Sequence, residues 1–466
     1  QHHMVTKDAV ESAALAMNNG CDLNCGHMYL HLSEAVSRGM VSESRLRAAV
    51  TNLYTTRLKL GMEQDKELPD NPYDKIPYSV VDSVEMREFN ESVSEKTFVL
   101  LKNNGILPLN REKLRTIAVI GPNADSRRAL VGNYEGTASR YITISEGIQD
   151  YVGDSVRVLV SEGCDLYKEN WKKNRIAEVR EMAEMSDVVI LCLGLDAGIE
   201  GEQGDAGNDF ASGDKPDLKL PGEQNQILEA ALDSGKPVVV LLLSGSALAV
   251  NTAQERAAAV MQCWYPGAQG GRAAARILFG EVSPQGHLPV TFYKSTEELP
   301  EFTDYSMKNR TYRYMKQEAL YPFGYGLTYT SFSYDNMECG AGRQTFQKMK
   351  AGEKIQLPVS VRVCNTGNFD CAETVQVYVK ALCDGSPNPQ LKGFGKVFLK
   401  AGEEKQVTVW LSEEAFELYD ENGQIYFTDE GYTVYIGGSQ PDTRSRTLTG
   451  TVPLRQNLWS EVVNNT

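Results

Sequence analysis

The stretch VVILCLGLDAGIEGEQGD, residues 188–205, carries the strongest indication of the fold. Its first part is an uninterrupted apolar run, Val188–Leu193, which is typical of a strand buried on both faces of a parallel sheet. Its second part changes at once to glycines and carboxylates. In an open parallel sheet, ligands bind beyond the carboxyl ends of the strands, so this acidic loop lies where a functional site is expected.

Similar apolar runs recur on both sides of this stretch and alternate with helical patterns. The expected strands are Thr116–Ile120, Arg157–Val160, Val188–Leu193, Val238–Leu243 and Ala259–Gln262. The expected helices lie near 84–101, 172–185, 222–233 and 270–279. Strands that alternate with helices predict a mostly parallel sheet covered on both faces, which is an α/β sandwich.

The two flanking regions have different patterns. Residues 6–60 predict three helices and a short strand at Cys21–Leu23, as at the end of a (β/α) barrel, but too few residues to build one. From about residue 350 the apolar residues recur with a period of two, which predicts a fibronectin type III-like β-sandwich. The expected organisation is a barrel end at 1–62, a linker at 63–95, the α/β sandwich at 96–335, the β-sandwich at 345–450 and a tail at 451–466.

Composition excludes some classes of function. The net charge of −15 argues against nucleic acid as a partner, because neutralising phosphates requires clustered Lys and Arg. No apolar run reaches the length of a membrane span, so no membrane partner is expected. The nine cysteines are an odd number without paired zinc-finger spacing. They indicate reduced thiols, which favour a cytoplasmic location, and they argue against a metal site.

The acidic loop holds the best candidates for chemistry. Glu200, Glu202 and Asp205 could supply one proton-shuttling carboxyl group, and a solvated acidic loop without function is the alternative. The loop at 121–125 also follows a strand, but it has neither Gly-x-Gly-x-x-Gly nor a Walker lysine, which argues against dinucleotide binding. Ser244 lacks the Gly-x-Ser-x-Gly elbow of a nucleophilic serine.

Nine short motifs, taken in their order along the chain, resemble glycoside hydrolase family 3. They are Gly20–Gly26, Val99–Asn103, Leu107–Leu109, Ile120–Ala124, Gly132–Gly136, Leu220–Gly222, Trp264–Gly267, Leu278–Glu281 and Tyr321–Leu327. The resemblance covers essentially the whole chain. It implies a (β/α) barrel, an α/β sandwich and a fibronectin-like domain, and it implies hydrolysis of terminal β-linked sugars with retention.

The resemblance also implies roles for individual residues. A barrel Asp forms a glycosyl-enzyme intermediate, and a Glu of the sandwich domain protonates the departing oxygen and then activates water. Glu202 matches this acid/base position best, because Glu202 and Asp205 resemble the family's Glu-Gly-x-Asp-Arg motif without its Arg; Glu200 is the alternative. Tyr134 would approach the leaving-group side of the site. No metal or organic cofactor is implied.

The family's nucleophile precedes the Gly-Cys-Asp-Leu segment in a Ser/Thr-Asp motif. Residues 1–20 contain only Asp8, without that motif, and Asp22 matches a structural position instead. The nucleophile is therefore expected outside this chain, with the rest of the barrel supplied by a missing segment or a companion chain. The expected function is that of a retaining exo-acting β-glucosidase or β-xylosidase acting on β-linked glycosides. The alternative is a catalytically silent carbohydrate-binding or scaffolding chain.

Overall fold

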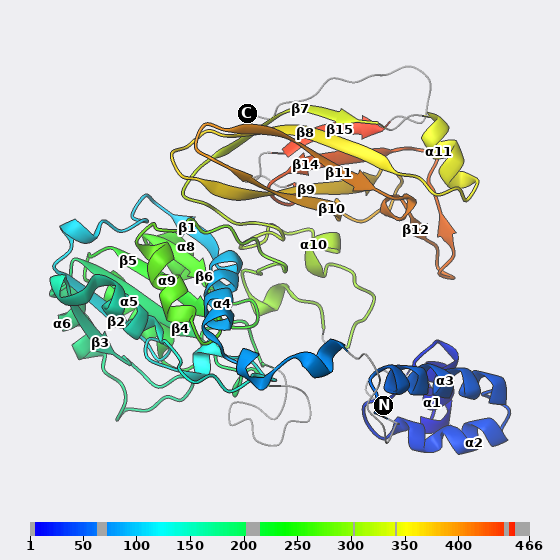
Figure 1. Cartoon of the computed structure of the whole chain (residues 1–466), viewed down its shortest axis with the longest axis horizontal. Helices are drawn as coiled ribbons and strands as arrows, with labels where there is room; N and C mark the ends of the chain where they lie inside the picture. Colours follow the sequence, from blue (N-terminus) through cyan, green and yellow to red (C-terminus); the bar gives the residue numbers. More distant parts are fainter. Residues whose placement is uncertain are drawn as a thin grey trace. The chain divides into compact units, whose positions relative to one another are not determined.

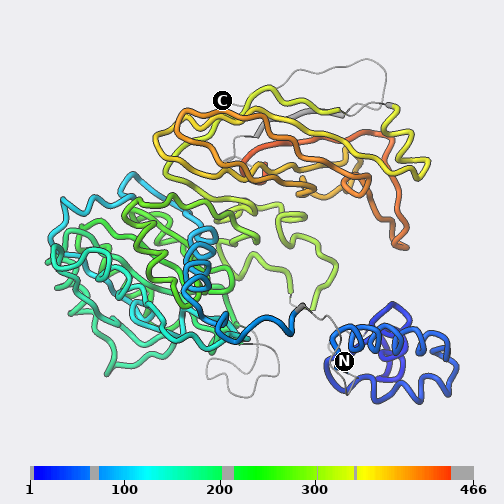
Figure 2. Tube along the Cα trace, viewed as in Figure 1, coloured from blue at the N-terminus to red at the C-terminus, as the bar shows by residue number. Residues whose placement is uncertain are grey.

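The computed structural model describes residues 5–62, 72–201, 215–301, 303–340, 343–441 and 447–452. The chain divides into two compact units. Unit 1 consists of Gln1–Val81 and Glu301–Tyr305, and unit 2 consists of Asp82–Pro300 and Ser306–Thr466. Figures 1 and 2 follow the chain from its amino terminus to its carboxyl terminus.

Unit 1 contains three helices around a small apolar core. They are α1 (Ala9–Asn18), α2 (Leu32–Ser37) and α3 (Glu43–Lys59). Met17 of α1, Ala35 of α2 and Ala49 of α3 are fully buried in this core. The hydroxyl of Ser42 caps α3 by accepting a hydrogen bond from the Arg45 backbone N–H, which fixes the start of the helix.

The strand expected at Cys21–Leu23 is wrong, because the structure has an irregular segment there. Asp22 is instead held by two side chains of α3: Arg45 Nη2 lies 2.6 Å from Asp22 Oδ1, and Asn52 donates a hydrogen bond of 2.8 Å to Oδ2. A strand needs a neighbouring strand to pair with, and the described part of unit 1 contains none. The assignment of this unit to the end of a barrel stays a prediction.

A six-stranded sheet forms the centre of the α/β part of unit 2 (Figure 1). Its strands are β1 (Val99–Asn103), β2 (Thr116–Ile120), β3 (Arg157–Ser161), β4 (Val188–Gly194), β5 (Val238–Leu243) and β6 (Ala259–Gln262). Their order is β1-β6-β5-β4-β2-β3, and all neighbours are parallel except β1 and β6. The expectation of a mostly parallel sheet is therefore confirmed. The strand order reverses between β2 and β4.

Helices pack against both faces of this sheet. They are α4 (Val84–Thr97), α5 (Ile144–Val152), α6 (Ile176–Glu184), α7 (Gln224–Leu232), α8 (Asn251–Arg256) and α9 (Gly270–Leu278). One core cluster contains side chains of α6, α7 and α8, and the other contains side chains of α5 and α9. Alternate residues of β4 enter the two clusters, Leu191 the first and Cys192 the second, which explains why its apolar run is continuous.

Two helical expectations differ from the structure. The helix expected at 84–101 ends at Thr97, because Val99–Leu101 are buried and pair with β6 as the antiparallel strand β1. Helix α5 lies outside the expected helices. The sequence does carry a signal for α5, since Thr143 and Glu146 form a capping box at its start.

The second part of unit 2 is an antiparallel β-sandwich. Its strands are β7 (Phe332–Cys339), β8 (Leu357–Asn365), β9 (Cys371–Ala381), β10 (Gln390–Leu399), β11 (Glu404–Leu411), β14 (Tyr432–Gly437) and β15 (Thr447–Val452), with the hairpin β12 (Leu418–Tyr419) and β13 (Ile425–Tyr426) and the short helix α11 (Arg343–Lys350). The short helix α10 (Thr311–Tyr314) precedes the sandwich in the chain. The sheets β10-β9-β14-β15 and β11-β8-β7 enclose one apolar core. The expected sandwich is confirmed.

Hydrogen bonds and aromatic contacts join the two parts of unit 2. Gln376 of β9 donates to the carbonyl oxygen of Gly324 at 3.0 Å. Phe323 and Tyr378 of β9 lie edge to face, with their ring centroids 6.4 Å apart. The described residues include no helix with the length and apolar character that a membrane crossing needs.

Candidate active site

The acidic loop leaves β4 at the edge of the sheet where the strand order reverses. Asp196 shapes its first turn: Oδ1 accepts hydrogen bonds from the backbone N–H groups of Gly198 at 2.8 Å and Ile199 at 3.1 Å. The Glu200 N–H donates to the Asp196 carbonyl oxygen at 3.0 Å. These bonds turn the chain back toward the sheet and set the direction of the Glu200 side chain.

The Glu200 carboxylate binds residues that follow two neighbouring strands. Its Oε2 accepts a hydrogen bond of 2.7 Å from the Gly245 backbone N–H, beyond β5. The same oxygen accepts a hydrogen bond from the Tyr265 hydroxyl, beyond β6. Burial raises the pKa of Tyr265, and the charge of Glu200 raises it further. Tyr265 therefore keeps its proton and remains a donor to this carboxylate.

The second carboxylate oxygen of Glu200 has different surroundings. Oε1 is shielded from solvent and has no hydrogen-bond partner among the residues that the structure describes. A buried acceptor without a partner is costly, by roughly 1–3 kcal/mol. In native proteins such an atom calls for a specific explanation, for example a bound water or ion, local strain or a role in chemistry.

Glu202, the first candidate for the acid/base, and Asp205 lie outside the described residues. The description stops at Gly201 and resumes at Lys215. Lys215 donates from Nζ to Ser246 Oγ at 2.9 Å and to the Ala247 carbonyl oxygen at 2.8 Å. Burial lowers the pKa of Lys215, and the negative charge of Glu200 acts in the opposite direction.

The loop after β2 meets the acidic loop from the other side of the reversal point. Asn123 is buried and donates from Nδ2 to the Leu195 carbonyl oxygen at 2.8 Å. Arg128 Nε lies 3.6 Å from Asp196 Oδ2, but its side chain is 75% exposed, so the pair adds little stability. The acidic loop is thus held between the ends of β2, β5 and β6.

Tyr134 is separate from the Glu200 contacts. Its backbone has φ of 65° and its side chain is fully exposed. Its neighbours Gly132 and Glu135 line a cavity of about 290 Å³ that also includes Tyr265. This cavity is at the small end of the usual range for ligand pockets. It connects the Gly132–Gly136 motif with the tyrosine that binds Glu200.

Sequence reasoning did not assign roles to Asp196, Lys215 or Gly245, and it did not predict the contact of Tyr265 with Glu200. Their partners lie far apart in sequence, since Gly245 and Tyr265 follow Glu200 by 45 and 65 residues. The available signal was position: Gly245 and Tyr265 follow the expected strands Val238–Leu243 and Ala259–Gln262 directly. In a parallel sheet, such positions share one edge.

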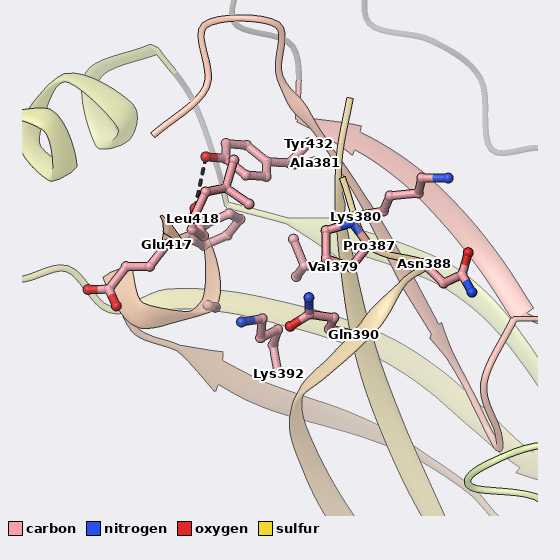
Figure 3. A pocket seen from close by; sticks show the side chains of 12 residues that line it. Val379, Lys380, Ala381, Pro387, Asn388, Gln390, Lys392, Glu417, Leu418 and Tyr432 are labelled. Carbon is pink, nitrogen blue, oxygen red and sulfur yellow. Dashed lines mark hydrogen bonds between the residues drawn. The ribbon is translucent and has the colours of Figure 1, made fainter. Parts of the chain in front are cut away.

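The pocket in the β-sandwich is too small for a sugar. The described residues hold no group of three or more His, Cys, Asp or Glu that could bind a metal ion. A pocket in the β-sandwich, lined by Val379, Lys392 and Leu418 among others, has a volume of about 20 Å³ (Figure 3). This is room for one water molecule at most. Tyr432 closes one side by donating to the Phe416 carbonyl oxygen at 2.8 Å.

Comparison with known proteins identifies both parts of unit 2. Residues 98–329 match the glycosyl hydrolase family 3 C-terminal domain. Residues 373–440 match the fibronectin type III-like domain. The chain belongs to glycoside hydrolase family 3.

The relatives include enzymes named for two sugars. A xylan 1,4-beta-xylosidase from Xylanibacter ruminicola is 28% identical over 97% of this chain, and a beta-xylosidase from Formosa agariphila is 30% identical over 97%. The structure of a β-glucosidase from Erythrobacter marinus aligns with 96% of this chain at 29% identity and a TM-score of 0.74. The chain spans 68%, 62% and 61% of these three proteins, respectively.

Proposed function

We propose that this chain forms the acid/base-bearing part of a retaining, exo-acting β-glycosidase that removes terminal β-linked xylosyl or glucosyl residues. One observation carries the proposal: the Glu200–Glu202 segment begins at the reversal point of a parallel sheet, in a chain whose relatives are β-xylosidases and β-glucosidases. This edge of the sheet is where α/β proteins bind ligands.

In the proposed reaction, Glu202 acts in both steps. It first protonates the departing glycosidic oxygen while a nucleophilic carboxylate attacks the sugar. It then removes a proton from water, which hydrolyses the glycosyl-enzyme intermediate. The nucleophilic Asp belongs to the family's barrel and is contributed by residues outside this sequence or by a companion chain. We use "complete enzyme" for this chain together with those barrel residues.

The test compares the complete enzyme with its Glu202→Ala variant on p-nitrophenyl β-xyloside and β-glucoside. Loss of the general acid/base should lower kcat by about 10²- to 10⁴-fold. Azide should restore turnover and yield a β-glycosyl azide, because this anion attacks the anomeric carbon of the glycosyl-enzyme intermediate in place of water, releases the nucleophilic carboxylate, and needs no general base. The exposed Glu184, on α6, supplies the control variant Glu184→Ala.

Three outcomes are informative. A preference for the xyloside or the glucoside assigns the sugar. Unchanged turnover in Glu202→Ala would exclude this residue as the acid/base. A complete enzyme that hydrolyses no β-glycoside but binds β-linked oligosaccharides would instead identify a catalytically silent carbohydrate-binding protein.

A further inference from the structure

A crevice with a volume of about 700 Å³ lies beyond the carboxyl ends of β2 and β3, and β3 is an edge strand of the sheet (Figure 1). Gly121, Arg127 and Arg128 line it from the segment after β2, and Glu162 and Arg175 line it from the segment after β3. The volume is within the usual range for ligand pockets. Ligands of α/β proteins bind at this edge of a parallel sheet. The crevice therefore has the size and the position of a binding site.

Three arginine side chains determine which ligand the crevice can take. Arg127, Arg128 and Arg175 line it from two separate segments of the chain. Arg128 Nε lies 3.6 Å from Asp196 Oδ2, and Arg175 Nη1 lies 3.6 Å from Glu178 Oε2, which is too far for a hydrogen bond. The side chains of Arg128 and Arg175 are 75% and 46% exposed, so both can turn toward a ligand. A guanidinium group binds a carboxylate through two parallel hydrogen bonds.

The carboxylates that line the same crevice are engaged within the fold. Asp125 Oδ1 accepts a hydrogen bond of 2.7 Å from Thr143 Oγ1. Glu146 Oε2 accepts a hydrogen bond of 3.0 Å from the Thr143 N–H, as part of the capping box of α5. Glu162 Oε2 lies 3.9 Å from Lys173 Nζ. These negative charges therefore have partners of their own, and the arginines remain to bind an anion.

The segment between β3 and α6 is a loop that is held at its base and on its inner side. The Arg175 N–H donates to the Gly163 carbonyl oxygen at 2.9 Å, which closes the loop. The buried Glu223 accepts hydrogen bonds from the Asn170 N–H at 3.4 Å and from Asn174 Nδ2. The loop therefore has a defined shape before any ligand binds, which reduces the entropy cost of binding.

The tip of this loop presents a tryptophan among cationic side chains. Trp171 is 82% exposed, and Lys172 Nζ lies 5.5 Å from the centroid of its ring. Residues 167–175 contain three lysines and one arginine but a single carboxylate, in a chain with a net charge of −15. Four residues separate Trp171 from Arg175, so their Cα atoms are at most about 14 Å apart. A short oligosaccharide can span this distance.

We propose that the crevice and the loop at 163–175 form a second saccharide-binding site, whose ligand is an oligosaccharide that carries carboxylate groups. Arg127, Arg128 and Arg175 bind the carboxylates, and Trp171 packs against the apolar face of a sugar ring. A saccharide fits a chain that belongs to a glycoside hydrolase family, and its carboxylates fit the arginines. The proposal goes beyond the proposed function, because it concerns binding and not hydrolysis.

Isothermal titration calorimetry of this chain with four probes tests the proposal. Two probes are anionic saccharides, namely tetragalacturonate and a xylotriose that bears one glucuronic acid branch. Xylotetraose is the neutral control, and an N-acetylated tetra-aspartate peptide is the charged control without a sugar. Both anionic saccharides should bind at least about tenfold more tightly than either control, because only they offer a carboxylate and a sugar ring together. Added salt should weaken this binding, because ions screen exposed charges.

Single substitutions assign the binding to this site. Arg127→Ala and Arg175→Ala should each weaken the binding of the anionic saccharides by about tenfold. Trp171→Ala should weaken it by about three- to tenfold. The exposed Arg180 of α6 and the exposed Trp410 of β11 supply the matched controls Arg180→Ala and Trp410→Ala, which should leave the binding unchanged. Far-UV circular dichroism checks that every variant keeps its fold.

Four results would overturn the proposal. The first is that neither anionic saccharide binds, and the second is that xylotetraose binds as tightly as they do. The third is equal binding of the tetra-aspartate peptide, which would indicate a general anion surface. The fourth is that the arginine variants bind like their control, which would place the ligand elsewhere. None of these results concerns the turnover of p-nitrophenyl glycosides by the complete enzyme, so the two proposals fail independently.

Discussion

Two glutamate–tyrosine pairs in unit 2 share one contact but differ in their surroundings. At the sheet edge, the Tyr265 hydroxyl donates to Glu200, and in the β-sandwich the Tyr334 hydroxyl donates to Glu373. Glu200 also has a backbone donor at 2.7 Å. Glu373 is only 5% exposed, and burial raises its pKa to about 7. The two carboxyl groups therefore differ in burial and in their further hydrogen-bond donors, although each accepts from a tyrosine hydroxyl.

The site of Glu373 explains its raised pKa. Desolvation favours the neutral carboxyl group, while the Tyr334 hydrogen bond and the positive charge of Lys396 favour the charged form and offset only part of the effect. The backbone leaves no space for an additional donor, since a Cβ atom at Gly438 would lie 2.6 Å from Glu373 Oε1. Glu373 therefore changes charge near neutral pH, inside the fold.

The largest expected effect concerns Glu373→Gln. The folded carboxyl group keeps its proton up to about pH 7, whereas the unfolded chain releases it near the usual 4.5. The stability that it contributes is fully present below pH 4.5 and is lost as the pH rises through 7. This loss amounts to roughly 3 kcal/mol. Glutamine cannot titrate, so the variant should gain that amount over the parent between pH 4.5 and 8.

Urea unfolding of the parent and Glu373→Gln at several pH values measures this difference. Glu421→Gln, at an exposed position in the same sandwich, is the control and should show the parent's pH dependence. Equal slopes for the parent and Glu373→Gln between pH 4.5 and 7 would contradict the prediction.

A second effect, of opposite sign, is expected at His287. Burial and the nearby Lys396 lower the pKa of His287 to about 4. The unfolded chain binds a proton near 6.5, so the stability contributed by the neutral ring is present above pH 6.5 and is lost as the pH falls through 4. The loss is at most roughly 3 kcal/mol, and less because the residue is only half-buried. In His287→Gln this loss on acidification should disappear.

The two groups oppose each other in the parent between about pH 4.5 and 6.5. Glu373→Gln should therefore lose stability on acidification more steeply than the parent, and His287→Gln should gain stability under the same conditions. The exposed His27 provides the control variant His27→Gln. A pH dependence in His287→Gln identical to that of this control would remove His287 from the explanation.

The sequence predicted those strands that carry an uninterrupted apolar run or a regular alternation of apolar and polar residues. The strands β2, β4, β5 and β6 follow from uninterrupted apolar runs, and the sandwich follows from its alternation. Cys21–Leu23 was assigned as a strand from three residues, and nothing in the described part of unit 1 pairs with it. The helical pattern of α4 runs directly into β1. The helix ends at Thr97 because the residues that follow pair with β6, and this pairing cannot be recognised from the local sequence.

The candidate site was predicted to the level of the loop, and its contacts were not. Glu200 lies after β4, as expected, but its partners Gly245 and Tyr265 become its neighbours only when β4, β5 and β6 align. From sequence, Glu202 was preferred to Glu200 because Glu202 and Asp205 match the family's Glu-Gly-x-Asp-Arg motif, although the Arg of this motif is missing. Glu202 as the acid/base stays a prediction.

The smallest expected effect comes from removing the shared contact in each pair. In Tyr334→Phe the buried Oε1 of Glu373 loses the Tyr334 hydroxyl as its donor, which should cost roughly 1–3 kcal/mol in the free energy of unfolding at pH 8. In Tyr265→Phe the Oε2 of Glu200 keeps the Gly245 N–H, so the cost should be about 1 kcal/mol or less. Urea unfolding at pH 5 and pH 8 measures both variants. At pH 5 the Glu373 carboxyl group carries its own proton, so the cost of Tyr334→Phe should fall. Equal costs at pH 8 would show that the backbone donor adds nothing and that the two pairs are equivalent.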